Sequence, residues 1–142
     1  MKLHWSPRSP FVRKVLITAH ETGHVARLEL VRSVAAMSRP NAQLMLDNPL
    51  SKIPTLVLDD GTSLYDSTVI CEYLDCLDDS LDVDIKRVSF LFPREGRQRW
   101  DALRRNALGS GLLDVLILWR NERERPSASQ SSELMAAFET KV

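Results

Sequence analysis

Two Ser-Pro pairs stand near the start of the chain, in the stretch SPRSPFVRKV (residues 6–15). Serine before a proline at the first helical position is a natural N-cap, so the ordinary role of Ser9 is to accept a hydrogen bond from a free N–H of the helix. The hydroxyl can also donate to an anion, because the unpaired N–H groups and the helix dipole favour negative charge there. Ser6 lies too early for this and is expected to shape the loop with Pro7. Ser9 is therefore the candidate for chemistry.

The second candidate is an Ile-Pro pair in SKIPTL (51–56), directly before a predicted strand. A bond before proline is the one peptide bond that adopts the cis form at a cost of about 0.5–1 kcal/mol. A cis turn would expose the N–H and C=O of Ile53 to an extended peptide ligand, and Lys52 offers a cation for a terminal carboxylate. A plain loop turn is the alternative, and the Ile53-Pro54 dipeptide by itself favours that alternative.

The third candidate is an Asp-Ser pair before an apolar helix pattern, in LYDSTVICEYL (64–74). The commonest use of such a pair is as an N-cap. In the alternative, Ser67 and the first free N–H groups of the helix hold a carboxylate, while Asp66 accepts from an ammonium group. One helix end would then recognise the head group of an amino acid.

The elements between these segments predict an α/β domain. A short strand at 2–5, a helix from Pro10 to about Thr22 and an alternating strand at 25–32 give the order β-α-β. A helical patch around residues 44–46, a hairpin and a closing helix follow. The predicted hairpin joins TLVL (55–58) to SLY (63–65), and the predicted closing helix covers 66–74. A parallel βαβ unit followed by a hairpin and a helix is the layout of a thioredoxin-like domain, with helices on both faces of a small sheet.

After Pro93 the sequence turns to helical spacing. A broad apolar stripe predicts a long helix that ends before Pro126, and SASQSSE offers caps for a further helix. Gly109 and Gly111 each cost the long helix about 1 kcal/mol relative to alanine, which predicts another backbone close to that face. We therefore expect a thioredoxin-like domain over 1–78, a linker over 79–93 and a partial all-α domain over 94–142. The stripe consists of Trp100, Leu103, Ala107, Gly111, Leu112, Val115, Leu116 and Trp119.

The composition restricts the partners. The chain has 142 residues, and its 19 basic residues balance 19 acidic ones without a block of like charge, so nothing in it predicts binding to nucleic acid or anionic lipid. The longest apolar run (112–119) is too short to span a bilayer, and no signal peptide is recognisable, which predicts a cytoplasmic protein. Cys71 and Cys76 have the spacing of neither a redox pair nor a metal site, so we expect ordinary thiols and no metal.

Together these segments resemble a known family. Residues 1–75 resemble the N-terminal domain of glutathione S-transferases through SPFVRKV, NPLSKIPTL and LYDSTVICEYL, and the pattern is similar to the serine-type branches, including many bacterial proteins. GLLDVLILWRNERERP (111–126) is similar to a helix in the all-α domain of the bacterial members. The resemblance covers nearly the whole chain. Family members carry a longer all-α domain, so we expect either a fragment or a truncated relative whose missing surface is covered by a dimer partner.

The resemblance implies a glutathione transferase. Glutathione would be the co-substrate, a small apolar electrophile the second substrate, and the protein a homodimer with a role in detoxification. Serine at position 9 favours conjugation over thiol-disulfide reduction, because a hydroxyl cannot form a mixed disulfide. The implied roles are a hydrogen bond to the glutathione sulfur from Ser9, pairing of the cysteinyl unit with the backbone of Ile53 beside cis-Pro54, the glycine carboxylate on Lys52, and the γ-glutamyl group on Asp66 and Ser67.

Other activities remain open on the same scaffold. Serine-type relatives include glutathione-dependent isomerases and dehalogenases. A non-catalytic binding or regulatory protein is the alternative from a different class, and glutathione affinity would separate it from an enzyme.

Overall fold

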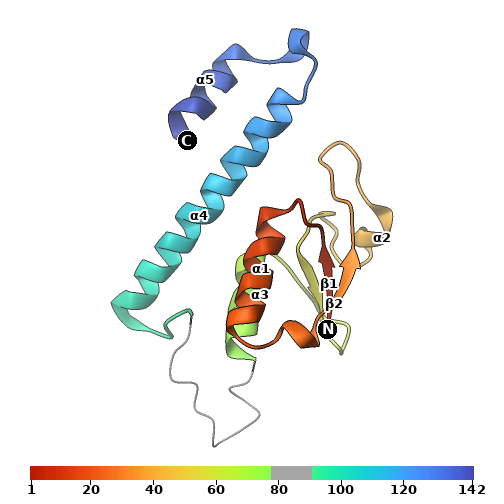
Figure 1. The fold of residues 1–142 in the computed structure, drawn as a ribbon, viewed down its shortest axis with the longest axis vertical. Helices are drawn as coiled ribbons and strands as arrows, with labels where there is room; N and C mark the ends of the chain where they lie inside the picture. Colours follow the sequence, from red (N-terminus) through yellow and green to blue (C-terminus); the bar gives the residue numbers. More distant parts are fainter. Residues whose placement is uncertain (78–90) are drawn as a thin grey trace, which may run out of the picture. The chain divides into compact units, whose positions relative to one another are not determined.

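The computed structural model describes residues 1–77 and 91–142 of the chain (Figure 1). The chain divides into two compact units, Met1–Arg94 and Glu95–Val142. Most of the linker expected at 79–93 lies outside the described residues.

A four-stranded mixed sheet forms the centre of the first unit, with the strand order β2-β1-β3-β4. β2 is parallel to β1, β3 is antiparallel to β1, and β4 is antiparallel to β3. This confirms the predicted βαβ unit and hairpin, and the unit has the thioredoxin-like α/β fold. The strands are β1 (Lys2–Trp5), β2 (Glu29–Arg32), β3 (Thr55–Val57) and β4 (Ser63–Leu64).

Three α-helices belong to this unit: α1 (Pro10–Glu21), α2 (Ala42–Met45) and α3 (Ser67–Cys76). α1 and α3 pack against each other on one face of the sheet, and α2 lies on the other side (Figure 1). α1 ends as predicted, because Gly23 adopts a positive φ of 77° just after the C-cap residue Thr22, a conformation that glycine adopts without steric penalty.

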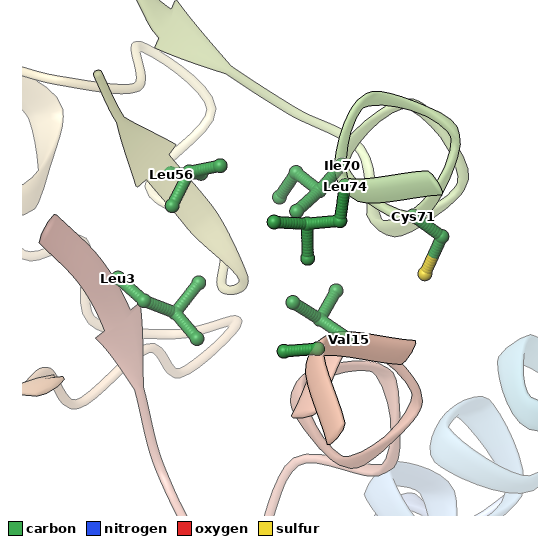
Figure 2. Packing of buried hydrophobic residues seen from close by; sticks show 7 residues of the cluster. Leu3, Val15, Leu56, Ile70, Cys71 and Leu74 are labelled. Carbon is green, nitrogen blue, oxygen red and sulfur yellow. The ribbon is translucent and has the colours of Figure 1, made fainter. Parts of the chain in front are cut away.

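The core of the first unit lies between the sheet and these two helices. Leu3 and Leu56 point from neighbouring strands toward Val15 of α1 and toward α3 (Figure 2). The alternation of strand side chains puts Leu3 on the helix-covered face and His4 on the opposite one. Each fully buried aliphatic side chain contributes about 1.5–3 kcal/mol to folding. The buried cluster comprises Leu3, Val15, Ala19, Leu56, Ile70, Cys71 and Leu74.

Two details of the first unit differ from expectation. The strand predicted at 25–32 begins only at Glu29, and Val25–Arg27 form a 3₁₀ turn, η1. β1 begins at Lys2, whose register partner is Glu29, so earlier residues lack a strand partner. In α3, the helical spacing of Val69, Ile70, Tyr73 and Leu74 predicts one apolar face, but Val69 is 47% exposed. Ile70 and Leu74 are buried as expected, and the buried face also includes Ser67, Cys71 and Asp75, since a polar residue with hydrogen-bond partners can occupy a buried position.

The second unit is all-α, as predicted, with α4 (Gly96–Arg123), a short 3₁₀ turn η2 (Ser127–Ser129) and α5 (Ser132–Lys141). Ser131 caps α5 by accepting a hydrogen bond from Leu134 N–H at 3.2 Å. The backbone expected close to Gly109 and Gly111 is not found within the described residues, because a Cβ added at either glycine would meet nothing within 4 Å. No helix in the described ranges is both long and apolar enough to cross a membrane.

Candidate functional site

The three candidate segments meet at one end of the sheet. β1 ends at Trp5, and β3 begins beside it because the strands are antiparallel with His4 opposite Thr55. β4 runs antiparallel to β3 and therefore ends on the same side. The loop after β1, the loop before β3 and the start of α3 thus share this end. Open α/β sheets bind ligands just outside the carboxyl ends of their strands.

Ser9 is the N-cap of α1, and its Oγ accepts a hydrogen bond from Val12 N–H at 3.2 Å. A hydroxyl also has one proton to donate, and that of Ser9 has no acceptor among the described residues. Capping and donation are therefore compatible in one side chain. Ser6 shapes the loop as predicted, because its carbonyl accepts from Ser9 N–H at 3.1 Å and its Oγ from Arg8 N–H at 3.4 Å.

The Ile53–Pro54 peptide bond is cis, and Pro54 is buried. The N–H and C=O of Ile53 have no hydrogen-bond partner in the described part of the chain, since the ladder of β3 starts only at Thr55. The side chain of Lys52 is exposed. This segment therefore presents one free main-chain donor, one free main-chain acceptor and a neighbouring cation.

Two residues that the sequence did not single out hold this loop. Asn48 and Thr55 are fully buried, and Asn48 Nδ2 donates to Thr55 Oγ1 at 2.9 Å. Both side chains donate to the carbonyl of Lys52, Asn48 at 3.2 Å and Thr55 at 2.8 Å. The available signal was the Asn-Pro pair of NPLSKIPT, which is typical of a turn.

Asp66 is the N-cap of α3, and its Oδ1 accepts from Thr68 N–H at 2.9 Å and from Val69 N–H at 3.4 Å. The Tyr65–Asp66 peptide bond is cis. The sequence predicted that several free N–H groups of this helix hold a carboxylate. Two of these groups, those of Thr68 and Val69, already donate to Asp66 and are not free. Ser67 N–H and the second oxygen of Asp66 remain without partners among the described residues. Ser67 itself is buried, with 3% of its surface exposed.

Further polar side chains lie on α1 and α3 beyond this end of the sheet. Lys14 Nζ donates to Thr68 Oγ1 at 3.2 Å, which brings a cation to the first turn of α3. Cys71 is buried, and burial raises the pKa of its thiol, which disfavours the reactive thiolate form. The described residues contain no group of three or more His, Cys, Asp and Glu side chains that could hold a metal ion.

Comparison with known proteins identifies the family. The family model of the glutathione S-transferase N-terminal domain matches residues 8–77, a range that contains Ser9, the Ile53–Pro54 turn and the start of α3. The chain belongs to the glutathione S-transferase superfamily. A glutathione transferase family member from Pseudomonas fluorescens Pf-5, solved with bound glutathione, is 38% identical with a TM-score of 0.89, over 99% of this chain and 65% of that one.

Other glutathione S-transferase relatives agree with this assignment. A glutathione S-transferase from Methylobacillus flagellatus KT, solved with glutathione bound, is 34% identical with a TM-score of 0.78, over 99% of this chain and 64% of that one. The uncharacterized GST-like protein YibF of Escherichia coli K12 is 29% identical over the whole chain, which covers 64% of that protein. The chain thus spans about 65% of the length of the Pseudomonas relative.

Proposed function

We propose that this chain binds glutathione at the end of the sheet and that Ser9 stabilises the glutathione thiolate for attack on a small apolar electrophile. The observation that carries the proposal is the geometry of Ser9, whose Oγ caps α1 through Val12 N–H and still has a proton to donate. The bound glutathione in the Pseudomonas and Methylobacillus relatives supports the choice of ligand.

The free groups of the site match the three parts of the tripeptide. The cysteinyl main chain pairs with Ile53 N–H and C=O as a short added strand beside cis-Pro54. The glycine carboxylate lies within reach of the exposed Lys52 ammonium group. At the start of α3, Ser67 N–H receives the γ-glutamyl carboxylate, and the free oxygen of Asp66 accepts from the γ-glutamyl ammonium group.

The energetics of thiol activation are within reach of these groups. A free thiol has a pKa of about 8.5, and bringing it to about 6.5 requires about 2.7 kcal/mol of preference for the thiolate. One hydrogen bond to a charged group supplies about 1.5–3 kcal/mol, and a helix N-terminus adds about 0.3–1 kcal/mol. The thiol proton leaves to solvent, the sulfur forms a bond to the electrophilic carbon, and the leaving group departs with its electron pair.

The proposal also includes a homodimeric assembly and a cytoplasmic location for the protein.

Three substitutions at Ser9 test the proposal, because they separate capping from donation. Ser9→Thr keeps both functions, whereas Ser9→Ala and Ser9→Gly remove the hydroxyl. Glycine is a nearly competent N-cap, and alanine costs about 1 kcal/mol there. We therefore expect Ser9→Ala to have a lower melting temperature than Ser9→Gly. In both variants, conjugation of glutathione to a chlorinated nitrobenzene should fall about 10- to 100-fold.

The measurement is the thiolate absorbance of bound glutathione as a function of pH, combined with conjugation rates. The thiol pKa should rise equally in Ser9→Ala and Ser9→Gly and stay near the wild-type value in Ser9→Thr. Wild-type conjugation rates in Ser9→Ala and Ser9→Gly would show that the Ser9 hydroxyl does not stabilise the thiolate. If calorimetry detects no binding at millimolar glutathione, the chain is a non-catalytic relative, and the proposal fails as a whole.

A further inference from the structure

A buried polar network lies on the face of the sheet opposite α1 and α3. His4 is 3% exposed, and both of its ring nitrogens have partners. Nε2 lies 2.7 Å from Asp47 Oδ2, and Nδ1 lies 2.8 Å from Ser33 Oγ. Lys2 Nζ reaches the same oxygen of Asp47 at 3.2 Å. An imidazole, a carboxylate and an ammonium group therefore meet beside the sheet.

The network does not have the properties of a nucleophilic site. Serine, histidine and aspartate are the residues of a hydrolase triad, but a nucleophilic serine must be reachable by its substrate. Ser33 is 6% exposed, and its Oγ faces His4 and, at 3.4 Å, the carbonyl of Val31. These contacts join residues within the protein, so the network must act by holding the chain in position.

The network lies directly beside the contacts that hold the loop before β3. His4 and Thr55 are register partners on adjacent antiparallel strands, so their side chains stand next to each other on one face. The two side chains bind consecutive residues of the loop that leads into β3: His4 binds Asp47, and Thr55 binds Asn48. Asn48 in turn accepts from Leu50 N–H at 3.0 Å. The sheet therefore holds the loop through two adjacent polar contacts.

The loop has few other attachments to the domain. Of residues 45–53, only Asn48 is fully buried. The preceding helix α2 has four residues, too few to be stable by itself. Leu46 and Leu50 are 77% and 62% exposed and contribute little packing. Without the contact between His4 and Asp47, Asn48 would be held by its own side chain, by its N–H, which donates to the carbonyl of the buried Leu44 at 2.8 Å, and through the contact of Lys2 with Asp47.

We propose that His4 and Asp47 are positioning residues for glutathione: their contact holds the backbone at Asn48 and thereby places Lys52 and Ile53. This inference rests on the proposed function, because the two placed residues are the ones assigned to the tripeptide. His4 itself touches no ligand, since it lies on the buried face and acts through Asp47 and Asn48.

Two substitutions of His4 separate its two contacts. In Gln the amide nitrogen lies as far along the side chain as Nε2, so His4→Gln can still donate to Asp47. In Asn it lies only as far as Nδ1, so His4→Asn can reach Ser33 but not Asp47. We expect the glutathione dissociation constant to stay within about twofold of wild type in His4→Gln and to rise about tenfold in His4→Asn and Asp47→Ala.

Steady-state kinetics distinguish positioning from general destabilisation. The KM for glutathione should rise in His4→Asn, while kcat at saturating glutathione stays within about twofold of wild type, because no hydrogen bond among residues 1–77 and 91–142 joins the pair to Ser9. Equal dissociation constants in His4→Gln and His4→Asn, or a loss of kcat alone, would overturn the inference.

Amide hydrogen exchange provides a readout that needs no ligand, so it still applies if wild type binds no glutathione and the proposed function fails. The amides of Leu50 and Ser51 donate to Asn48. Their exchange should be faster in His4→Asn and Asp47→Ala than in His4→Gln and wild type. Unchanged exchange in Asp47→Ala would show that the contact does not hold the loop.

Discussion

Thr18 Oγ1 donates a hydrogen bond to Cys71 Sγ over 3.2 Å and so joins α1 to α3 inside the first unit. Both residues are buried. Burial is the main influence on the Cys71 thiol and raises its pKa, and the hydrogen bond from Thr18 opposes this effect only in part. The thiol therefore stays protonated at neutral pH, and the pair acts as a packing contact between the helices.

The first prediction concerns thiol reactivity. Because Cys71 is buried and protonated, a thiol reagent should modify only Cys76 in the folded protein and both cysteines in denaturant. Mass spectrometry of the labelled protein checks this result. Cys76→Ser is the matched control and should show no labelling until the chain unfolds. Rapid labelling of folded Cys76→Ser would contradict the assigned environment of Cys71.

The second prediction concerns Asp75 at the end of α3. Its buried carboxylate accepts from Leu91 N–H at 3.0 Å and from Phe92 N–H at 2.8 Å, so it fixes the chain at these residues. Asp75→Asn replaces one acceptor oxygen by an NH₂ group that faces an N–H donor. We expect the free energy of unfolding to fall by about 1–3 kcal/mol, measured by urea denaturation.

The control for Asp75 is Asp114→Asn, because Asp114 is exposed on α4. This substitution should change the free energy of unfolding by less than about 0.5 kcal/mol. If both variants unfold at the same urea concentration as wild type, the carboxylate of Asp75 does not hold the chain at residues 91 and 92.

The third prediction is a pH dependence in the second unit. Glu122 Oε1 accepts from Ser131 N–H at 2.7 Å, and Arg125 contacts both carboxylate oxygens. The Ser131 N–H, followed by Arg125, lowers the pKa of Glu122 below its ordinary value of 4.5. The native carboxylate releases its proton more readily than the unfolded one. Its contribution to stability is therefore fully present above about pH 4.5 and is lost as the pH falls through the native pKa.

The measurement for Glu122 is exchange of the Ser131 amide as a function of pH, corrected for the intrinsic exchange rate. Protection should decrease below pH 4.5 in wild type. In Glu122→Gln, protection should be weaker and should no longer depend on pH in that range. The same acid dependence in both proteins would assign the effect to another group.

The fourth prediction concerns the two glycines inside α4. A methyl group added at Gly109 or Gly111 meets no atom within 4 Å, so nothing in the described chain opposes it. Gly109→Ala and Gly111→Ala should each stabilise the helix by about 1 kcal/mol, as measured by thermal unfolding followed by circular dichroism. Destabilisation, together with a smaller sedimentation coefficient than wild type, would instead show that a second chain packs against this face.

The order of the elements could be predicted because it depends on local patterns. Period-2 and period-3.6 spacings, together with Ser9, Pro10 and Gly23, specify the βαβ unit, and the Asp-Asp-Gly turn specifies the hairpin. The start of β2 could not be placed because it depends on where β1 begins. Local patterns carry no information on the register between strands that are distant in sequence.

The helix ends and the Ile-Pro turn of the candidate site could be predicted from the sequence. The residues that hold the turn in place could not. Ser9 and Asp66 precede apolar helix patterns, which makes them recognisable as caps. His4 and Asp47 are 43 positions apart, and neither position shows a helix or strand signal that links it to the other. A buried polar pair of this kind becomes visible only when the sheet brings the two residues together.

The hydrogen-bonding groups that Ile53 offers are its main-chain N–H and C=O. Every amino acid except proline supplies this pair in the same form. Replacement of Ile53 by valine, leucine or methionine would leave that donor and acceptor in place. The tripeptide binding proposed at this point therefore does not depend on which side chain stands at position 53. Relatives with little remaining sequence in common can retain it as long as their chains follow the same path.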